Sequence, residues 1–370
     1  MSSPSISVES GGILFQDAAC QAYFPSIVEL SNGELLASFD LGTDMEHVDV
    51  RTYITRSGDG GRTWSEPDMI FDSSTLPYSA STLGRISPLH DGGTVALLNV
   101  CNRARAGAGL ANPENEGYVE TQFATLQSRD EGRAWSAPCW VTPPILWNTF
   151  EICSPIIEAT QDRWLLPASL WRNWDGECPF GMKAVVFVSE DRGATWPRCV
   201  EVMDLWSQHI TAWEQKHTHL SDGRWLVVCW AYDYAQRKSL PTRYTFSHDH
   251  GASYGASLEA PLAGETCTPL GLPGNHVLCI YRRVDERGLW AHLARFEGER
   301  WLPLADEPLW GARRAAYGRE SASKTEQMAT LQFGYPQSVR MRDGGIFVVF
   351  WCVEDGGARI RWVRLRCELP

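Results

Sequence analysis

The chain has 370 residues, of which 44% are hydrophobic and 21% are charged, so it can bury a large core and lacks the composition of a disordered protein. Its formal net charge is -12, and it contains no run rich in lysine and arginine. A protein that binds nucleic acid needs a basic patch to displace counterions, so the composition excludes DNA and RNA as expected partners.

The apolar runs and the cysteines indicate where the protein is expected to work. No window approaches 18 uninterrupted apolar residues, and segment 1–10 lacks a basic start followed by an apolar core. We therefore expect no membrane partner and no export signal. The 11 cysteines lie mostly in apolar runs, without CxxC spacing. This pattern favours reduced thiols and a cytoplasmic location.

Six hairpins are predicted along the chain. Each has an extended segment, a turn and a run of strand-forming residues, and several turns carry Asn-Gly or Asp-Gly, the preferred residues of tight hairpins. The copies span 23–39, 84–100, 151–170, 213–230, 267–282 and 334–351. Apart from a possible helix over 312–330, no long stretch has helical periodicity.

An eight-residue motif, Ser-x-Asp-x-Gly-x-Thr-Trp, recurs between the hairpins. It begins at Ser57, returns at Ser128 and Ser189 with few changes, and has a weaker copy at Ser247. The aspartate can accept hydrogen bonds from backbone amides, the glycine can take a positive φ, and the tryptophan can pack beneath the hairpin. These are the features of an Asp box, a structural turn.

The repeats predict one all-β domain over 1–370, a six-bladed β-propeller with Asp-box turns, because strand-turn units about every 60 residues suit four-stranded blades around a channel. The last hairpin and the C-terminal run ARIRWVRLR supply only three strands of the sixth blade. We expect the N-terminal segment SISVES to add the fourth strand. This would close the ring and hide the sheet edges.

Asp boxes with six such blades resemble the sialidase (neuraminidase) superfamily, over the whole chain. The resemblance implies an active site on the face opposite the Asp boxes. It also implies a retaining glycosidase with a tyrosine nucleophile, a glutamate that activates it, an aspartate acid/base and three arginines that hold the substrate carboxylate.

The family's motifs assign four residues of this chain. Glu214, in the sequence WEQ ahead of the fourth hairpin turn, matches the activating glutamate. Tyr335, in the sequence GYPQ that opens the sixth inner strand, matches the nucleophile. The acid/base would come from the loop before the first Asp box, where Asp44 and Asp49 both stand.

The arginines depart from the family's pattern. Tyr23 stands where the first arginine is expected and Trp230 where the second is expected, while Arg282 or Arg283 matches the third. Bidentate arginine–carboxylate contacts are the main reason such sites select sialic acid. We therefore expect a substrate other than sialic acid.

Position within the predicted blades adds further candidates. Arg85 and Glu151 open the second and third inner strands, so they are expected at the channel mouth. There they would either form a salt bridge or bind substrate. Trp171 and Trp174, in one loop, would stack on sugar rings or pack in the core. His217 lies on one face of a strand with a second histidine, as packing or as a general base. We expect no metal and no cofactor.

The leading functional prediction is an exo-acting glycoside hydrolase for small oligosaccharides, acidic ones included. Tyr335 and Glu214 would react with the sugar, and Asp44 or Asp49 would act as acid/base. Two long insertions, 99–120 and 311–332, would overhang the site as lids or subunit contacts.

Two other functions stay open. A lyase for uronate-containing sugars would use His217, Tyr335, Tyr23 and Arg85, and its unsaturated product would absorb in the near ultraviolet. A propeller that only binds carbohydrate is the third possibility, because fold does not determine function.

Overall fold

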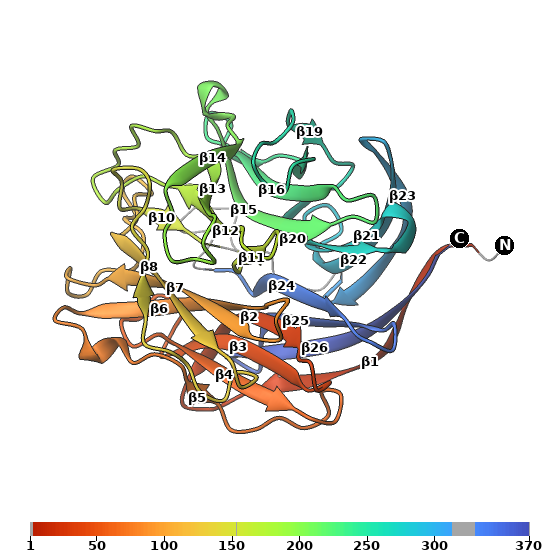
Figure 1. Cartoon of the computed structure of the whole chain (residues 1–370), viewed down its shortest axis with the longest axis horizontal. Helices are drawn as coiled ribbons and strands as arrows, with labels where there is room; N and C mark the ends of the chain where they lie inside the picture. Colours follow the sequence, from red (N-terminus) through yellow and green to blue (C-terminus); the bar gives the residue numbers. More distant parts are fainter. Residues whose placement is uncertain (1–2, 153, 313–329, 370) are drawn as a thin grey trace.

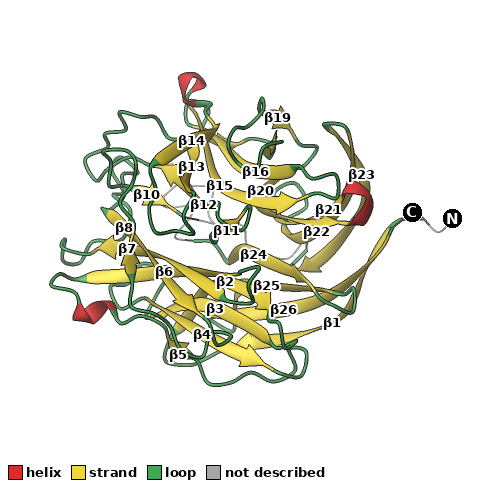
Figure 2. Cartoon of the chain, viewed as in Figure 1, coloured by secondary structure: helices red, strands yellow, loops and turns green. Residues whose placement is uncertain are grey.

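The computed structural model describes residues 3–152, 154–312 and 330–369, and the strands in these residues form six antiparallel sheets around a channel (Figure 1). Short 3₁₀ helices make up the remaining regular structure of this part of the chain (Figure 2): η1 (Ser73–Thr75), η2 (Trp206–Gln208) and η3 (Pro273–Asn275). The predicted all-β, six-bladed propeller is confirmed. The helix expected over 312–330 lies almost entirely outside the described residues.

Each sheet forms one blade of the propeller, and the first strand named for each blade is the one nearest the channel. Blade one contains β2 (Gln21–Glu29), β3 (Leu35–Gly42), β4 (Arg51–Ser57) and β5 (Asp68–Met69). Blade two contains β6 (Ala80–Pro88), β7 (Thr94–Asn102), β8 (Thr121–Ser128) and β9 (Cys139–Trp140). Blade three contains β10 (Phe150–Glu151), β11 (Ile157–Glu158), β12 (Trp164–Leu170), β13 (Ala184–Ser189) and β14 (Arg198–Met203). Blade four contains β15 (Ile210–His219), β16 (Trp225–Asp233), β17 (Lys238–Ser239), β18 (Arg243–Ser247) and β19 (Leu258–Glu259). Blade five contains β20 (Gly264–Leu272), β21 (His276–Arg283), β22 (Gly288–Glu297) and β23 (Arg300–Trp310). Blade six contains β24 (Phe333–Arg340), β25 (Ile346–Glu354), β26 (Gly357–Glu368) and β1 (Ser5–Phe15).

Neighbouring blades pack face to face, and this explains the continuous apolar runs in the sequence. The inner strand β2 contacts β6 and β24, and β20 contacts β15 and β24. Both faces of a middle strand are therefore covered: β7 (TVALLNVCN) is buried at every residue except its last. A strand covered on both sides has no reason to alternate apolar with polar residues. The outermost strand β1, in contrast, is largely exposed.

The Asp boxes have the predicted geometry. The carboxylate of Asp59 accepts hydrogen bonds from the backbone N–H of Thr63 (2.9 Å) and the hydroxyl of Ser57 (2.8 Å). These bonds lower the pKa of Asp59 to about 2. Gly61 has φ +89°, and a Cβ there would lie 2.5 Å from the Phe347 ring of blade six. The glycine is therefore required both by its backbone angle and by close contact with the neighbouring blade.

Strand β1 closes the ring, as the sequence predicts. It pairs with β26 from Ser5 opposite Glu368 to Phe15 opposite Ile360, so the first and last strands of the chain share blade six (Figure 1). The paired segment extends beyond the expected residues 5–10.

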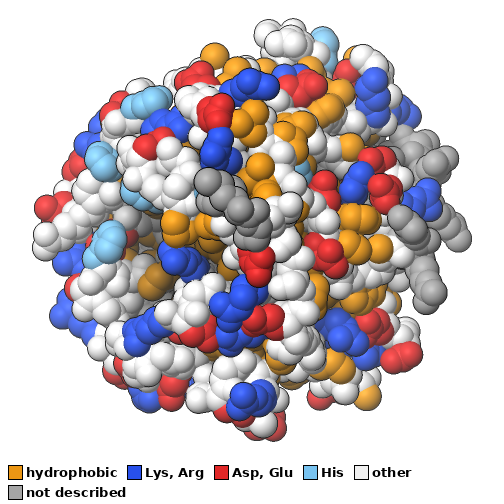
Figure 3. Space-filling model, turned by 90° about the vertical axis from the view of Figure 1, so that its right-hand side faces the viewer, with side chains coloured by type: hydrophobic (Ala, Val, Ile, Leu, Met, Phe, Trp, Pro, Cys, Tyr) orange, Lys and Arg blue, Asp and Glu red, His pale blue; other side chains and the backbone are white. Residues whose placement is uncertain are grey.

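The face toward the two chain ends carries charges of both signs. Lysine and arginine side chains are interspersed with aspartate and glutamate there (Figure 3). Ion pairs also join the two closing strands: Arg364 and Arg366 of β26 contact Glu9 of β1 at 3.0 and 2.5 Å. No helix in the described ranges is long and apolar enough to cross a membrane.

Removal of residues 1–10 is expected to lower the melting temperature by at least about 3 °C, because it deletes half of β1 with the buried Ile6 and exposes the edge of β26. Thermal unfolding followed by circular dichroism measures this. Removal of residues 1–4, which precede β1, is the matched control and should leave the melting temperature within about 1 °C. Equal melting of both truncated chains would show that β1 adds no stability.

Candidate active site

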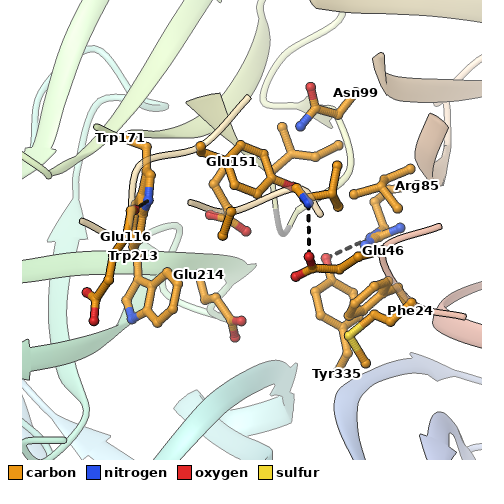
Figure 4. A pocket seen from close by; sticks show the side chains of 16 residues that line it. Phe24, Glu46, Arg85, Asn99, Glu116, Glu151, Trp171, Trp213, Glu214 and Tyr335 are labelled. Atoms are coloured by element: carbon orange, nitrogen blue, oxygen red, sulfur yellow. Dashed lines mark hydrogen bonds between the residues drawn. The ribbon is translucent and has the colours of Figure 1, made fainter. Parts of the chain in front are cut away.

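A pocket of about 140 Å³ opens at the mouth of the channel (Figure 4). Its floor comes from the innermost strands, which contribute Phe24, Arg85, Glu151, Glu214 and Tyr335. The loops that join the second and third strands of blades one to three form its walls. The Asp boxes follow the third strands, so antiparallel connection places them at the opposite end of the blades.

One wall is a loop from blade two that is fastened to blade three. We call residues 103–120, between β7 and β8, the strap. The backbone N–H of Tyr118 donates to the carbonyl of Arg172 (3.0 Å), and the indole N–H of Trp171 donates to the carbonyl of Glu116 (3.1 Å). The strap contributes Leu110, Ala111, Glu116 and Tyr118 to the pocket. The 99–120 insertion thus borders the candidate pocket.

The innermost strands carry a repeated bulge at the pocket. The register of β2, β15, β20 and β24 shifts where each passes the channel mouth. At this point Phe24, Glu214, Thr266 and Tyr335 have φ between 47 and 49°, a region that non-glycine residues rarely adopt. Successive side chains in a regular strand point to opposite faces. The bulge in β15 instead lets Trp213 and Glu214 both line the pocket.

A buried chain of polar contacts holds Tyr335. The Arg85 Nε donates to the phenolic oxygen at 2.7 Å, and the Arg85 Nη1 donates to Asp40 Oδ2 at 3.0 Å. Asp40 also accepts from the Thr52 hydroxyl (2.7 Å) and the Gly84 N–H (3.1 Å). Arg85 therefore lies at the site, as expected, but its guanidinium is already engaged by Asp40 and Tyr335.

Asp40 was not among the sequence candidates. It is fully buried, and burial raises the pKa of its carboxyl to about 6, although Arg85, Thr52 and the Gly84 amide favour the ionised form. The only sequence signal was an isolated aspartate within an otherwise apolar strand, SFDLG. Such a residue is expected to have a charged or hydrogen-bonding partner.

Four glutamates line the pocket: Glu46, Glu116, Glu151 and Glu214 (Figure 4). Glu214 is 8% exposed, and its Oε2 has no hydrogen-bond partner within the described part of the chain. Glu46 Oε2 accepts from the Leu110 N–H of the strap at 2.9 Å. Burial raises the pKa of Glu46, against the effect of that hydrogen bond. Burial, with the nearby Glu116 carboxylate, raises the pKa of Tyr234 well above its usual value.

The loop predicted to supply the acid/base reaches the pocket through a different residue. Asp44 and Asp49 are exposed and lie outside the pocket lining. Asp44 accepts from the Glu46 N–H (3.0 Å), and Asp49 accepts from the Thr43 N–H (3.0 Å), so both carboxylates shape the loop. Glu46 is the carboxylate of this loop that faces the cavity.

Aromatic rings form the wall between blades three and four. Trp171 stacks on Trp213 with ring centroids 4.7 Å apart and planes inclined by 25°, and Trp213 contacts Trp230 at 4.5 Å. Trp171 lines the pocket as predicted. Trp174 lies outside this pocket, under the guanidinium of Arg105 at 5.0 Å.

Arg282 and Arg283, the two alternative matches to the third family arginine, lie outside the pocket lining. Arg282 is buried against Glu265 at 2.9 Å and donates to the carbonyl of Phe333. Arg283 pairs with Asp285 at 2.7 Å. Among the residues that the structure describes, Arg85 is the only arginine or lysine in the pocket lining.

Tyr23 and His217 also lie outside the lining. The ring of Tyr23 packs on Trp351 with centroids 5.3 Å apart. The Nε2 of His217 lies 2.9 Å from Gln215 Oε1, and its ring contacts Tyr254 of the fourth Asp box. The His217 side chain is partly exposed, but burial of its imidazole disfavours the charged form and lowers its pKa to about 3, so the ring is neutral. Over the described ranges, no group of three or more His, Cys, Asp or Glu could hold a metal ion.

Replacing Arg85 with methionine is expected to cost about 3–5 kcal/mol of unfolding free energy, because it leaves the Asp40 carboxylate buried without its cation. Urea unfolding measures this. Asp40→Asn combined with Arg85→Met should recover part of the loss. Arg283→Met, which removes a more exposed pair, is the control and should cost less than about 1 kcal/mol. A cost at position 85 no larger than this control would contradict the structural role of the pair.

The chain is a six-bladed β-propeller with a pocket at the mouth of its channel. The family model described as BNR repeat-like domain matches residues 33–348. The chain therefore belongs to the BNR repeat-like family. No curated protein matches the sequence.

Solved structures share this fold at low sequence identity. A protein of unknown function from Dyadobacter fermentans superposes with TM-score 0.73 and 18% identity, covering 98% of this chain and 99% of that chain. The NanB sialidase of Streptococcus pneumoniae gives 0.69 and 13%, covering 96% and 70%. An α-L-arabinanase of Penicillium chrysogenum, solved with arabinobiose, gives 0.66 and 16%, covering 98% of each chain. The resemblance to sialidase-family propellers is thus confirmed for the fold.

Proposed function

We propose that this protein is a glycoside hydrolase that removes a terminal neutral sugar from small oligosaccharides. The observation that carries the proposal is the convergence of Tyr335, Glu214 and Glu46 on one small pocket beside the Trp171–Trp213 wall. Reactive carboxylates and a phenol supply the chemistry, and the flat indoles suit the apolar faces of a sugar ring.

The charges at the pocket favour a neutral substrate. Glu46, Glu116, Glu151 and Glu214 line it, while Arg85 is engaged by Asp40. A substrate carboxylate would lie among Glu116, Glu151 and Glu214, which disfavour a further negative charge, and would have to compete with Asp40 for the arginine. The arabinobiose in the related arabinanase structure is such a neutral sugar.

The shape of the pocket favours reaction at a chain end. The strap and the loop of Glu46 meet through the Leu110 N–H, so the pocket is walled on the side of blades one and two. An oligosaccharide therefore enters with its terminal residue. This arrangement supports exo action.

The residues at the pocket suggest a two-step reaction. Tyr335 attacks the anomeric carbon and Glu214 takes the phenolic proton, while Glu46 donates its proton to the departing sugar oxygen and that C–O bond breaks. Water then attacks the same carbon, Glu46 removes the water proton, and the Tyr335–sugar bond breaks as Glu214 returns its proton. The raised pKa of Glu46 suits a group that must hold a proton before the first step.

Aryl glycosides of neutral sugars, sialic acid and uronic acids test the substrate class. We expect release of the aryl group from one or more neutral glycosides only. Tyr335→Phe and Glu214→Gln should lower kcat/KM at least about 100-fold. Tyr23→Phe, with its ring outside the pocket, is the matched control and should retain activity. Activity on sialosides alone, or wild-type rates in Tyr335→Phe, would refute the proposal.

The role of Glu46 predicts how the rate depends on pH. Its raised pKa means that the protonated form, and with it the rate, is lost as the pH rises through that pKa. Glu46→Gln should therefore remove the alkaline limb of the pH–rate profile. It should slow substrates with poor leaving groups more than those with good ones. Asp44→Asn and Asp49→Asn should keep the limb; loss of it in either variant instead would move the acid to that aspartate.

The two other functions make different predictions in the same assays. A lyase would produce near-ultraviolet absorbance from uronate-containing sugars; its suggested base, His217, contacts Tyr254 away from the pocket. A propeller that only binds would produce neither aryl release nor absorbance, and its affinity for sugars would be found by calorimetry.

A further inference from the structure

Two buried cations lie against Tyr335. Arg85 donates from Nε to the phenolic oxygen at 2.7 Å, and its guanidinium carbon is 4.3 Å from the ring centroid. The ammonium nitrogen of Lys216 is 3.7 Å from the same centroid. Arg85 and Lys216 are each 2% exposed and Tyr335 is 4% exposed, so little water screens these charges.

The backbone directs Lys216 toward the tyrosine. It follows the bulge of β15, in which Glu214 lines the pocket. In the same bulge the side-chain Nε2 of Gln215 donates to the carbonyls of Ala168 and Val185 in blade three (2.7 Å each). The next side chain, Lys216, therefore reaches across the channel to blade six. Nothing in the sequence pointed to Lys216 as a site residue, because it is a single lysine within a predicted strand.

Arg85 is fixed in the same way from the other side. Its Nη1 is shared between Asp40 Oδ2 and the carbonyl of Gly84, which leaves Nε directed at the phenolic oxygen. A donor hydrogen bond and two cations within about 5 Å all favour the anionic form of a phenol. Arg85 contacts the phenolic oxygen and the ring of Tyr335, and Lys216 contacts the ring.

Other charged groups near Tyr335 oppose or balance this effect. Glu116, Glu151, Glu214 and, once ionised, Glu46 share its pocket and disfavour a further negative charge, as does burial itself. Asp40 contacts Arg85 on the side away from the phenol. Behind Gly334, Arg282 is paired with Glu265. The two cations in direct contact therefore have the largest influence on the ring.

We propose that Tyr335 is a phenolate at neutral pH, and that Lys216 is a positioning residue that, together with Arg85, keeps it ionised. The inference deepens the proposed function, since an ionised Tyr335 attacks without first passing a proton to Glu214. Glu214 is then available to accept a hydrogen bond from a sugar hydroxyl. The ionised state itself requires no substrate, so it is tested separately from hydrolysis.

The test is a near-ultraviolet titration of the purified full chain between about pH 5 and about pH 9, below the ordinary ionisation range of tyrosine. Wild-type protein is expected to show the absorbance of about one tyrosinate that Tyr335→Phe lacks. The buried Tyr23 and Tyr232 form a silent background, because burial raises the pKa of each to about 12. Identical spectra of wild type and Tyr335→Phe over this range would overturn the proposal.

Variants at position 216 test the role of the lysine. Lys216→Met should move the tyrosinate signal at least about one pH unit higher, a tenfold change in the ionisation equilibrium, whereas Lys216→Arg should keep it. If Lys216→Met does not fold, Lys216→Arg and the comparison with Tyr335→Phe still decide the ionised state. An unchanged titration in folded Lys216→Met would remove Lys216 from the proposal.

Kinetics separate this inference from the proposed function. The kcat of Lys216→Met should fall below that of wild type at neutral pH, and the ratio of the two kcat values should recover as the pH rises, with little change in KM. A merely structural defect would not produce this pH dependence of the ratio. No tyrosinate signal together with activity that depends on Tyr335 would leave the hydrolase intact and return the activating role to Glu214. A tyrosinate signal without activity on any glycoside would leave the ionised tyrosine and reject the hydrolase.

Discussion

The pocket depends on one backbone feature, a bulge that recurs where four innermost strands pass the mouth of the channel. The residue at each bulge has φ near +48°, an arrangement that costs roughly 1–3 kcal/mol per residue and persists only when the surrounding structure holds it. The hydrogen-bonded ladders on both sides and the packing between blades hold it here. Because of the bulges, Glu214 of blade four and Tyr335 of blade six depart from the alternation of a regular strand, and both side chains line the pocket.

The electrostatics of the site depend on the closed ring. Asp40 belongs to blade one, Arg85 to blade two, Lys216 to blade four and Tyr335 to blade six. The contacts among them therefore cross the channel, and a small rotation of one blade would change the field at the phenol. The pairing of β1 with β26 joins the two ends of the chain in blade six, the blade that also carries Tyr335.

The sequence predicted the blades well because their signals are local. An Asp box or an Asn-Gly turn is defined by a few adjacent residues, and its geometry hardly depends on the rest of the fold. Glu214 and Tyr335 were found by motif, and both line the pocket. Arg85 and Glu151 were found because they open inner strands.

The remaining site residues depend on conformation that the sequence does not encode locally. The choice among Asp44, Glu46 and Asp49 depends on which carboxylates the loop uses for its own hydrogen bonds. Lys216 reaches Tyr335 because a bulge shifts the register of its strand. The match of Arg282 to a family arginine did not identify a pocket residue, because the Arg282 guanidinium forms a salt bridge with Glu265 on the adjacent strand.

The strap has a consequence for how such propellers differ from one another. It is a single connection between two strands, and its contacts with blade three are made largely by backbone groups, such as the Tyr118 N–H and the Glu116 carbonyl. A shorter connection would leave the blades unchanged and open the wall into a groove, along which a polysaccharide could lie with sugars on both sides of the scissile bond. The length of one loop would then decide between trimming chains from their ends and cutting them internally.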